Sequence, residues 1–275
     1  MNQIPEKAYK NLEFLNSPPA RHIRILCEYE ETRQRLLHHR IHDTVVFFGS
    51  ARARPSEEAE ALLEQARSAA NEAASDETAI ALRRAEASVR MGRYYDDARE
   101  LSKRITAWSL ALTHGRSYVI CSGGGPGIME AANRGASDVE GGCSIGLGIS
   151  LPFEQGVNKY VTPELAFEFH YFFTRKYWFL YLCKALVIFP GGFGTMDELF
   201  ETLTLVQTGK IKKTLPIVLF GTDYWSRVLD LNVMSEFGTI SPEDLGLVYR
   251  TDSVDDAYRY LTTQLQGSAD SGLKG

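Results

Sequence analysis

Short apolar runs recur along the chain, and stretches of helical composition separate them. Three of these runs are Thr44–Phe48, Ala185–Phe189 and Pro216–Phe220. A strand that is apolar at nearly every position is buried on both faces, which is typical of parallel sheets covered by helices. Because parallel strands are joined by right-handed crossovers, this alternation predicts an α/β fold, with a doubly wound, mainly parallel Rossmann-like sheet and helices on both faces.

Composition suggests how the chain is organised around this sheet. Residues 1–42 are polar and helix-prone and predict an N-terminal helical arm, whereas residues 43–266 predict the Rossmann-like domain. Within that domain, residues 55–92 are rich in Ala, Glu and Arg and predict an inserted helical hairpin that breaks near Ser75–Asp76. Residues 267–275 predict a disordered tail.

Charge and composition disfavour several classes of protein. The 30 Lys and Arg residues against 35 Asp and Glu give a net charge of −5, so no basic footprint for nucleic acid or an anionic membrane is expected. No apolar run reaches the roughly 18 residues that a membrane helix needs, and Met1–Lys10 lacks the apolar core of a secretory signal. The four cysteines form no Cys-x-x-Cys, which disfavours disulfides and a zinc site. A cytoplasmic protein is expected.

Two glycine-rich turns each follow a predicted strand and open a predicted helix. They span Ser122–Gly127 and Pro190–Thr195. Backbone N–H groups can approach an anion where glycines carry no side chain, and the following helix offers its positive N-terminal end. A third loop, Gly49-Ser50, follows the first strand. Three such loops at one sheet edge predict a phosphate-bearing ligand, although a single glycine turn can equally be only a tight connection.

The form of the turns narrows the ligand further. Neither turn has the Gly-x-Gly-x-x-Gly pattern of dinucleotide sites, and the chain contains no Gly-x-x-x-x-Gly-Lys-Ser/Thr phosphate loop. These absences favour a mononucleotide.

Charged residues stand beside the second turn and in one apolar helix. Glu198 lies three residues after Thr195, which is the spacing of a helix capping box, but its carboxylate could instead serve the crevice. Arg175 and Lys176 are predicted at the start of a helix, where cations oppose the helix dipole. Their position therefore favours an anionic partner, either a substrate or a structural carboxylate.

The segments Ser122–Ala136 and Pro190–Glu198 together resemble the LOG (Lonely Guy) family of nucleoside 5′-monophosphate phosphoribohydrolases, many of which carry the label "possible lysine decarboxylase". The second segment matches the family pattern Pro-Gly-Gly-x-Gly-Thr-x-x-Glu at every fixed position. The resemblance implies that Arg175 and Glu198 are the catalytic pair. A Pro-x-Glu segment that binds substrate in the family is matched by Pro152-Phe153-Glu154. Together with the glycine loops this predicts a substrate-binding set made of Gly49, Ser50, Gly123, Gly124, Gly125, Met129, Glu130, Glu154, Lys176, Gly191, Gly192, Phe193, Gly194 and Thr195.

Two positions depart from the plant-like members of this family. These members have Met-His-x before the Arg-Lys pair, where this chain has Phe172-Phe173-Thr174. They also have glycine after the Met of the first motif, where this chain has Glu130. The departures put a cytokinin-type base preference in doubt and leave the glycosidase chemistry in place.

The implied activity is cleavage of the N-glycosidic bond of a nucleotide such as AMP, with no metal and no cofactor, by a homodimer or larger homo-oligomer. One alternative is a non-catalytic nucleotide or cofactor carrier, since fold does not fix function. A lysine decarboxylase would need pyridoxal phosphate on a Schiff-base lysine, and the chain contains no His-Lys pair of the usual anchor.

Overall fold

The computed structural model describes residues 5–112, 117–152 and 156–272. Its centre is a seven-stranded sheet in which every neighbouring pair of strands is parallel. The strand order is β4 (Ala166–Phe169), β3 (Ser144–Ile149), β2 (Val119–Ser122), β1 (Thr44–Phe48), β5 (Cys183–Ile188), β6 (Ile217–Phe220) and β7 (Val248–Thr251). The predicted doubly wound α/β sheet is confirmed.

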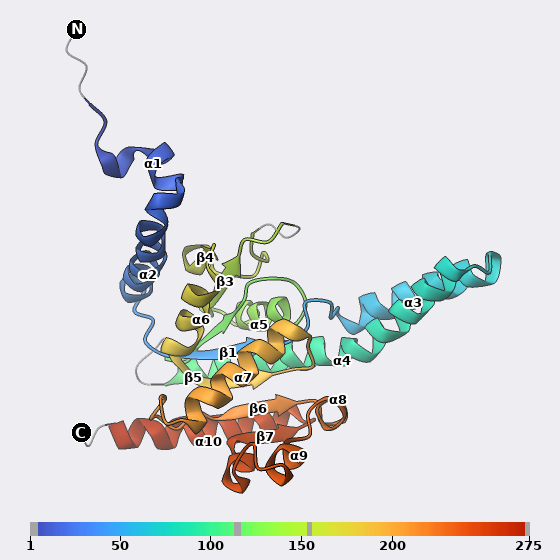
Figure 1. Cartoon of the computed structure of the whole chain (residues 1–275). Coiled ribbons are helices and arrows are strands. Elements are labelled where there is room, and N and C mark those ends of the chain that lie inside the picture. Colours follow the sequence, from blue (N-terminus) through green and yellow to red (C-terminus); the bar gives the residue numbers. More distant parts are fainter. Residues whose placement is uncertain (1–4, 113–116, 153–155, 273–275) are drawn as a thin grey trace.

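Each face of the sheet is covered by its own set of helices (Figure 1). Alternate residues of β1 divide between two cores, with Val45 and Phe47 in one and Val46 and Phe48 in the other. The first core contains α4 (Asp76–Ala111), α5 (Ile128–Ser137) and α10 (Val254–Gly272). The second contains α2 (Arg21–His38), α6 (Phe172–Tyr181), α7 (Phe193–Gln207), α8 (Thr222–Val228) and α9 (Leu231–Glu236). Burial of both faces is why these strands are apolar at consecutive positions.

Two helical extensions project from this core (Figure 1). The N-terminal one consists of η1 (Ala8–Lys10), α1 (Leu12–Asn16), η2 (Pro18–Ala20) and most of α2. The other is an antiparallel pair formed by α3 (Ser56–Glu72) and the first half of α4. Ser75 caps α4, because its hydroxyl accepts a hydrogen bond from Thr78 N at 3.2 Å.

The helix α4 is longer than the sequence indicated. Composition predicts that the hairpin ends at Gly92 and that a separate helix begins at Asp96, but α4 continues without a break to Ala111. Gly92 is buried where α4 passes α3, and a Cβ there would lie 2.9 Å from Ser56 Cα. Glycine at this position therefore permits close helix packing and does not end the helix.

Smaller differences occur towards the C-terminus. The residues after β6, which the sequence predicts as one helix over 224–235, form two helices, α8 and α9. Asp230 caps the second by accepting from Asn232 N at 3.0 Å. The helix α10 continues to Gly272, into residues 267–275, for which the composition predicts a disordered tail. Short 3-10 turns, η3 (Pro163–Leu165) and η4 (Pro242–Leu247), precede β4 and β7. None of the helices in the described ranges has the length and apolar character needed to cross a membrane.

Candidate active site

The order of the strands indicates where on the sheet a ligand would bind. From β1 the chain moves outward strand by strand to β4, and it then returns to the other side of β1 to form β5, β6 and β7. The strand order therefore reverses between β1 and β5. Ligands of open α/β sheets bind outside the carboxyl ends of the strands at such a reversal. The three predicted loops follow β1, β2 and β5 at this edge.

Ser50 joins these three loops through its backbone. Its N–H donates to Pro190 O in the second glycine turn at 3.0 Å. Its carbonyl accepts from Ile128 N, the first residue of α5 after the first glycine turn, also at 3.0 Å. These two hydrogen bonds link the three loops at this edge of the sheet.

A buried polar network holds the first glycine turn. Asn158 Nδ2 lies 3.0 Å from Gly124 O, 3.1 Å from Gly125 O and 2.9 Å from Asn133 Oδ1. Ser122 Oγ donates to the same Asn133 oxygen at 2.7 Å and accepts from Gly124 N at 3.0 Å. Because two carbonyls of the turn are bound to Asn158, their oxygens are fixed by the protein. Preorganisation of this kind lowers the cost of binding a ligand.

The glycines of the two turns have different roles. Gly124 and Gly127 have φ values of +71° and +72°, and a Cβ at Gly127 would lie 2.2 Å from Ser50 O, so the fold itself requires them. A Cβ at Gly191 would lie 2.1 Å from Thr195 Oγ1. By contrast, nothing in the described part of the chain lies within 4 Å of a Cβ built at Gly192 or Gly194. These two positions leave open space at the N-terminus of α7, where an anion is favoured.

The capping-box alternative for Glu198 is wrong. The helix α7 begins at Phe193 with Gly192 as its N-cap, so Thr195 is the third helical residue and Glu198 the sixth. Glu198 is therefore inside the helix and too far along it to bond the N-cap amide. Its place in the motif needs another explanation.

Glu198 is a buried carboxylate without a fixed partner. The residue is only 3% exposed, and its Oε2 has no hydrogen-bond partner in the described structure. Burial raises the pKa of Glu198 to about 7, against the opposing effects of Lys176 and then Arg175. A buried, unpaired carboxylate destabilises a fold, and such groups concentrate at functional sites.

Arg175 extends from α6 towards the same place. The helix begins at Phe172, earlier than predicted, so Arg175 is its fourth residue. Burial lowers the pKa of Arg175, whereas Glu198 and then Asp197 raise it. Its Nε is buried and has no hydrogen-bond partner among the described residues. The guanidinium carbon lies 5.2 Å from the ring centre of Phe172 and 5.5 Å from that of Phe179.

Lys176 connects the two helices of the site. Its Nζ lies 2.9 Å from Asp197 Oδ2 and 2.7 Å from Glu201 Oε2, so α6 and α7 are joined on either side of Glu198. For Lys176, the anionic partner expected from the sequence is therefore a pair of structural carboxylates, Asp197 and Glu201. With its amine in two ion pairs, Lys176 does not fit the free amine that a pyridoxal phosphate Schiff base requires.

The remaining predicted residues lie in different places. Met129 contacts the first turn, where a Cβ at Gly123 would be 2.6 Å from its Sδ. Glu130 Oε1 accepts from Tyr95 OH of α4 at 2.7 Å, which directs this carboxylate towards the opposite face of the sheet from α6 and α7. Phe193 is 96% exposed beside the second turn. Glu154 lies outside the described residues.

Some residues that shape the site were not predicted from the sequence. Asn133 and Asn158 support the first turn, and Tyr224 OH donates to Gly191 O in the second turn at 2.5 Å. Asn133 stands within the first motif, which was the one available signal. Asn158 and Tyr224 are 34 and 33 residues from their partners Gly124 and Gly191, so no local pattern indicates them.

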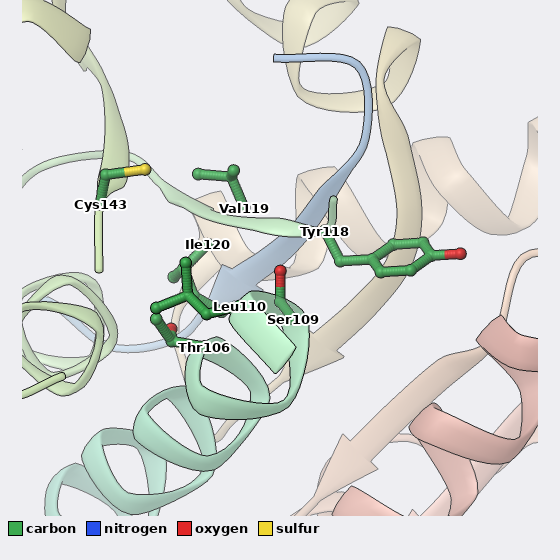
Figure 2. A pocket seen from close by; sticks show the side chains of 7 residues that line it. All are labelled: Thr106, Ser109, Leu110, Tyr118, Val119, Ile120 and Cys143. Atoms are coloured by element: carbon green, nitrogen blue, oxygen red, sulfur yellow. The ribbon is translucent and has the colours of Figure 1, made fainter. Parts of the chain in front are cut away.

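A small cavity elsewhere in the molecule is not this site. It has a volume of about 10 Å³, roughly one water molecule, and lies between the end of α4 and the start of β2 (Figure 2). Its lining includes Thr106 and Tyr118. It adjoins the amino end of β2, whereas the glycine turns lie at the carboxyl ends of the strands.

Fold and site together define a Rossmann-like protein in which the half-buried Arg175 of α6 lies near the buried Glu198 of α7, the helix that the second glycine turn opens. The model of the family described as "Possible lysine decarboxylase" matches residues 129–261, which confirms the resemblance to the LOG family. The family is commonly enzymatic, and the match supports a nucleotide-processing function. The comparison with curated proteins found no match.

Among solved structures, one match is the molybdenum cofactor binding protein from the phototrophic bacterium Rippkaea orientalis. It is 17% identical in sequence, with coverage of 81% of this chain and 95% of that chain and a TM-score of 0.45.

Proposed function

We propose that the protein hydrolyses the N-glycosidic bond of a nucleoside 5′-monophosphate, AMP or a similar nucleotide including cytokinin nucleotides, to free base and ribose 5-phosphate. The observation that carries this proposal is Glu198, a buried carboxylate with one unpartnered oxygen, close enough to Arg175 for each to shift the pKa of the other. The family match supports the same class of substrate.

Glu198 would stabilise the transition state. As the base leaves, the ribose becomes oxocarbenium-like and positively charged. A carboxylate that is 3% exposed is weakly screened by water, so its attraction for that charge is large. The same carboxylate would orient and activate the attacking water. With a pKa of about 7, a substantial fraction of Glu198 is ionised at neutral pH.

Arg175 would act on the substrate as a positioned cation. Its guanidinium lies near two aromatic rings, and its buried Nε–H has no acceptor among the described residues. A donor in this state can accept a new partner without breaking an existing bond. Arg175 would thereby orient the nucleotide or favour departure of the base.

The 5′-phosphate would occupy the glycine turns. Gly192 and Gly194 leave open space at the N-terminus of α7, which has the polarity for an anion. Binding of this non-reacting group would position the glycosidic bond against Glu198, which is how remote binding energy contributes to catalysis.

The alternative is a carrier that binds a nucleotide or cofactor without changing it. A carrier has no need of a buried carboxylate without a partner, because such a group lowers stability. Overnight incubation with AMP followed by chromatography separates the two functions, since a carrier returns AMP unchanged. A panel of nucleoside monophosphates, with the matching nucleosides as controls, would identify the preferred base.

We also propose that the chain forms a homodimer or larger homo-oligomer. Large side chains on α6 and α7 are unusually exposed, and they are Phe172, Phe173, Tyr177, Tyr181 and Phe200. An exposed apolar patch of this kind marks an interaction surface. Light scattering of the wild type and of Tyr181→Lys tests this, and a wild-type monomer would rule it out. The cytoplasmic location and the absence of nucleic-acid and membrane partners stay predictions.

A further inference from the structure

The helix α2 of the N-terminal arm contacts the start of the helix that carries Arg175. One carboxylate oxygen of Glu28 accepts from His170 N at 2.8 Å, and the other accepts from Thr174 Oγ1. Glu28 therefore spans the junction between β4 and α6. Thr174 is 6% exposed and immediately precedes Arg175. This contact joins residues 146 positions apart in the sequence.

Further contacts fix α2 against the same part of the core. The Tyr29 ring lies 5.4 Å from that of Tyr177 and 5.5 Å from that of Trp178, both on α6. Arg35 donates to Ala166 O at the start of β4 at 2.6 Å. Glu28 thus belongs to a packed interface. Its negative charge is also favourable at the N-terminus of α6.

Arg175 itself has little to hold it in place. Its Nε makes no hydrogen bond within the described structure, and its guanidinium has ring contacts only with residues of the same helix. The position of the guanidinium therefore depends on where the first turn of α6 lies. Glu28 anchors this turn at its amino end from outside the helix, whereas Asp197 and Glu201 of α7 hold Lys176, the residue after Arg175.

We propose that Glu28 is a positioning residue for Arg175, acting through Thr174, and that the N-terminal arm is in this way part of the catalytic apparatus. The arm lies outside residues 129–261, the part of the chain that matches the family. The proposal rests on the proposed function, because its main readout is turnover of AMP. It also assigns a use to Thr174, which stands immediately before the Arg-Lys pair.

The test compares four single variants and one double variant of the full chain. Glu28→Ala and Thr174→Val each remove one side of the contact, and the double variant removes both. Glu28→Gln keeps a carbonyl oxygen that can accept one of the two hydrogen bonds. Glu30→Ala is the matched control, because Glu30 is an exposed glutamate of the same helix whose ion pair is with Arg33. Initial rates on AMP are measured beside hydrogen exchange of residues 170–181.

The proposal predicts that Glu28→Ala and Thr174→Val each lower kcat about 10-fold or more while KM changes little, since a misplaced catalytic group costs rate. The double variant should be no slower than the worse single variant, Glu28→Gln should recover part of the loss, and Glu30→Ala should match the wild type. Wild-type kcat in Glu28→Ala would overturn the proposal.

Hydrogen exchange separates this proposal from the proposed function. If the wild type releases no base from any nucleotide, the proposed function fails, and exchange at α6 then decides whether Glu28 anchors the helix. Faster exchange of residues 170–181 in Glu28→Ala, with Glu30→Ala unchanged, supports the anchoring. Unchanged exchange in both variants overturns it.

Discussion

Arg175 and Glu198 each shift the pKa of the other across the α6–α7 interface, yet within the described structure no hydrogen bond or ion pair joins their side chains. Each keeps one buried polar atom without a partner. A buried ion pair selected for stability would be fully hydrogen-bonded. A donor and an acceptor without partners instead suit a site in which the substrate completes the hydrogen-bond network.

The first prediction concerns stability against pH. Burial raises the pKa of Glu198 from an ordinary 4.5 to about 7, so the folded state disfavours the ionised form. The wild type should lose stability from this residue as pH rises from 4.5 through 7, by up to about 3 kcal/mol. The glutamine side chain of Glu198→Gln cannot ionise, so this loss of stability with rising pH should be absent in the variant.

The measurement is the free energy of unfolding of both proteins from pH 4.5 to 8. Burial also raises the pKa of Asp97, which lies on α4, to about 6. Asp97→Asn therefore serves as a control for a half-buried carboxyl group outside the proposed site. A constant difference between Glu198→Gln and wild type over this range would show that Glu198 is not buried as described.

The second prediction separates ligand space from backbone strain at Gly192. The φ of Gly192 is −90°, so valine there causes no left-handed strain, and a Cβ meets no described atom within 4 Å. Gly192→Val should fold with a loss of about 1 kcal/mol or less, from the poorer helix cap. It should lose AMP affinity at least 10-fold by calorimetry, because the side chain occupies the proposed phosphate site.

Gly246→Val is the matched control, since Gly246 also has open space around it and lies just before β7, at the amino end of that strand. Its affinity for AMP should equal that of the wild type. If Gly192→Val also bound AMP normally, the second glycine turn would be excluded from the site.

The third prediction tests the support of the first glycine turn. Asn158→Asp keeps the oxygen that accepts from Tyr160 N but loses the amide that binds Gly124 O and Gly125 O. Gly125 O would be released, and Gly124 O would keep only its bond from Asn158 N at 2.6 Å, so the phosphate cradle would lose part of its support. The ratio of kcat/KM for AMP to that for adenosine should therefore fall about 10-fold or more.

This ratio is insensitive to a general loss of stability, because both substrates experience it equally. Ser102→Ala provides the control, since it deletes another buried hydrogen bond, from Ser102 Oγ of α4 to Ala132 O of α5. An unchanged ratio in Asn158→Asp would mean that the network supports the fold alone.

Some features of the fold have a local signal in the sequence, and others do not. The strands were predictable because burial on both faces leaves continuous apolar runs. Short local motifs pointed to Glu198 and Arg175, whose catalytic roles stay predictions. Gly92 misled the prediction, since helix packing against Ser56 overrides the low helix propensity of glycine. Glu28 and Asn158 left no signal, because their partners are distant in the sequence.

The fourth prediction is the pH dependence of catalysis. If the ionised form of Glu198 is active, kcat/KM for AMP should rise with pH up to about 7 and level off above it. The substrate phosphate also titrates, near pH 6. The residual activity of Glu198→Gln therefore serves as the reference, because its pH profile should lack the rise near pH 7 that comes from Glu198. A rate that falls with rising pH across this range would assign Glu198 the role of an acid.

Product analysis with AMP and adenosine, for the wild type and Glu198→Gln, tests the central claim most directly. The wild type should release adenine and ribose 5-phosphate from AMP in equal amounts and act poorly on adenosine. Glu198→Gln should bind AMP nearly normally by calorimetry but turn it over about 100-fold more slowly or worse, on the scale of a lost electrostatic group. Recovery of intact AMP from the wild type, or an equal kcat in the two proteins, would contradict the account.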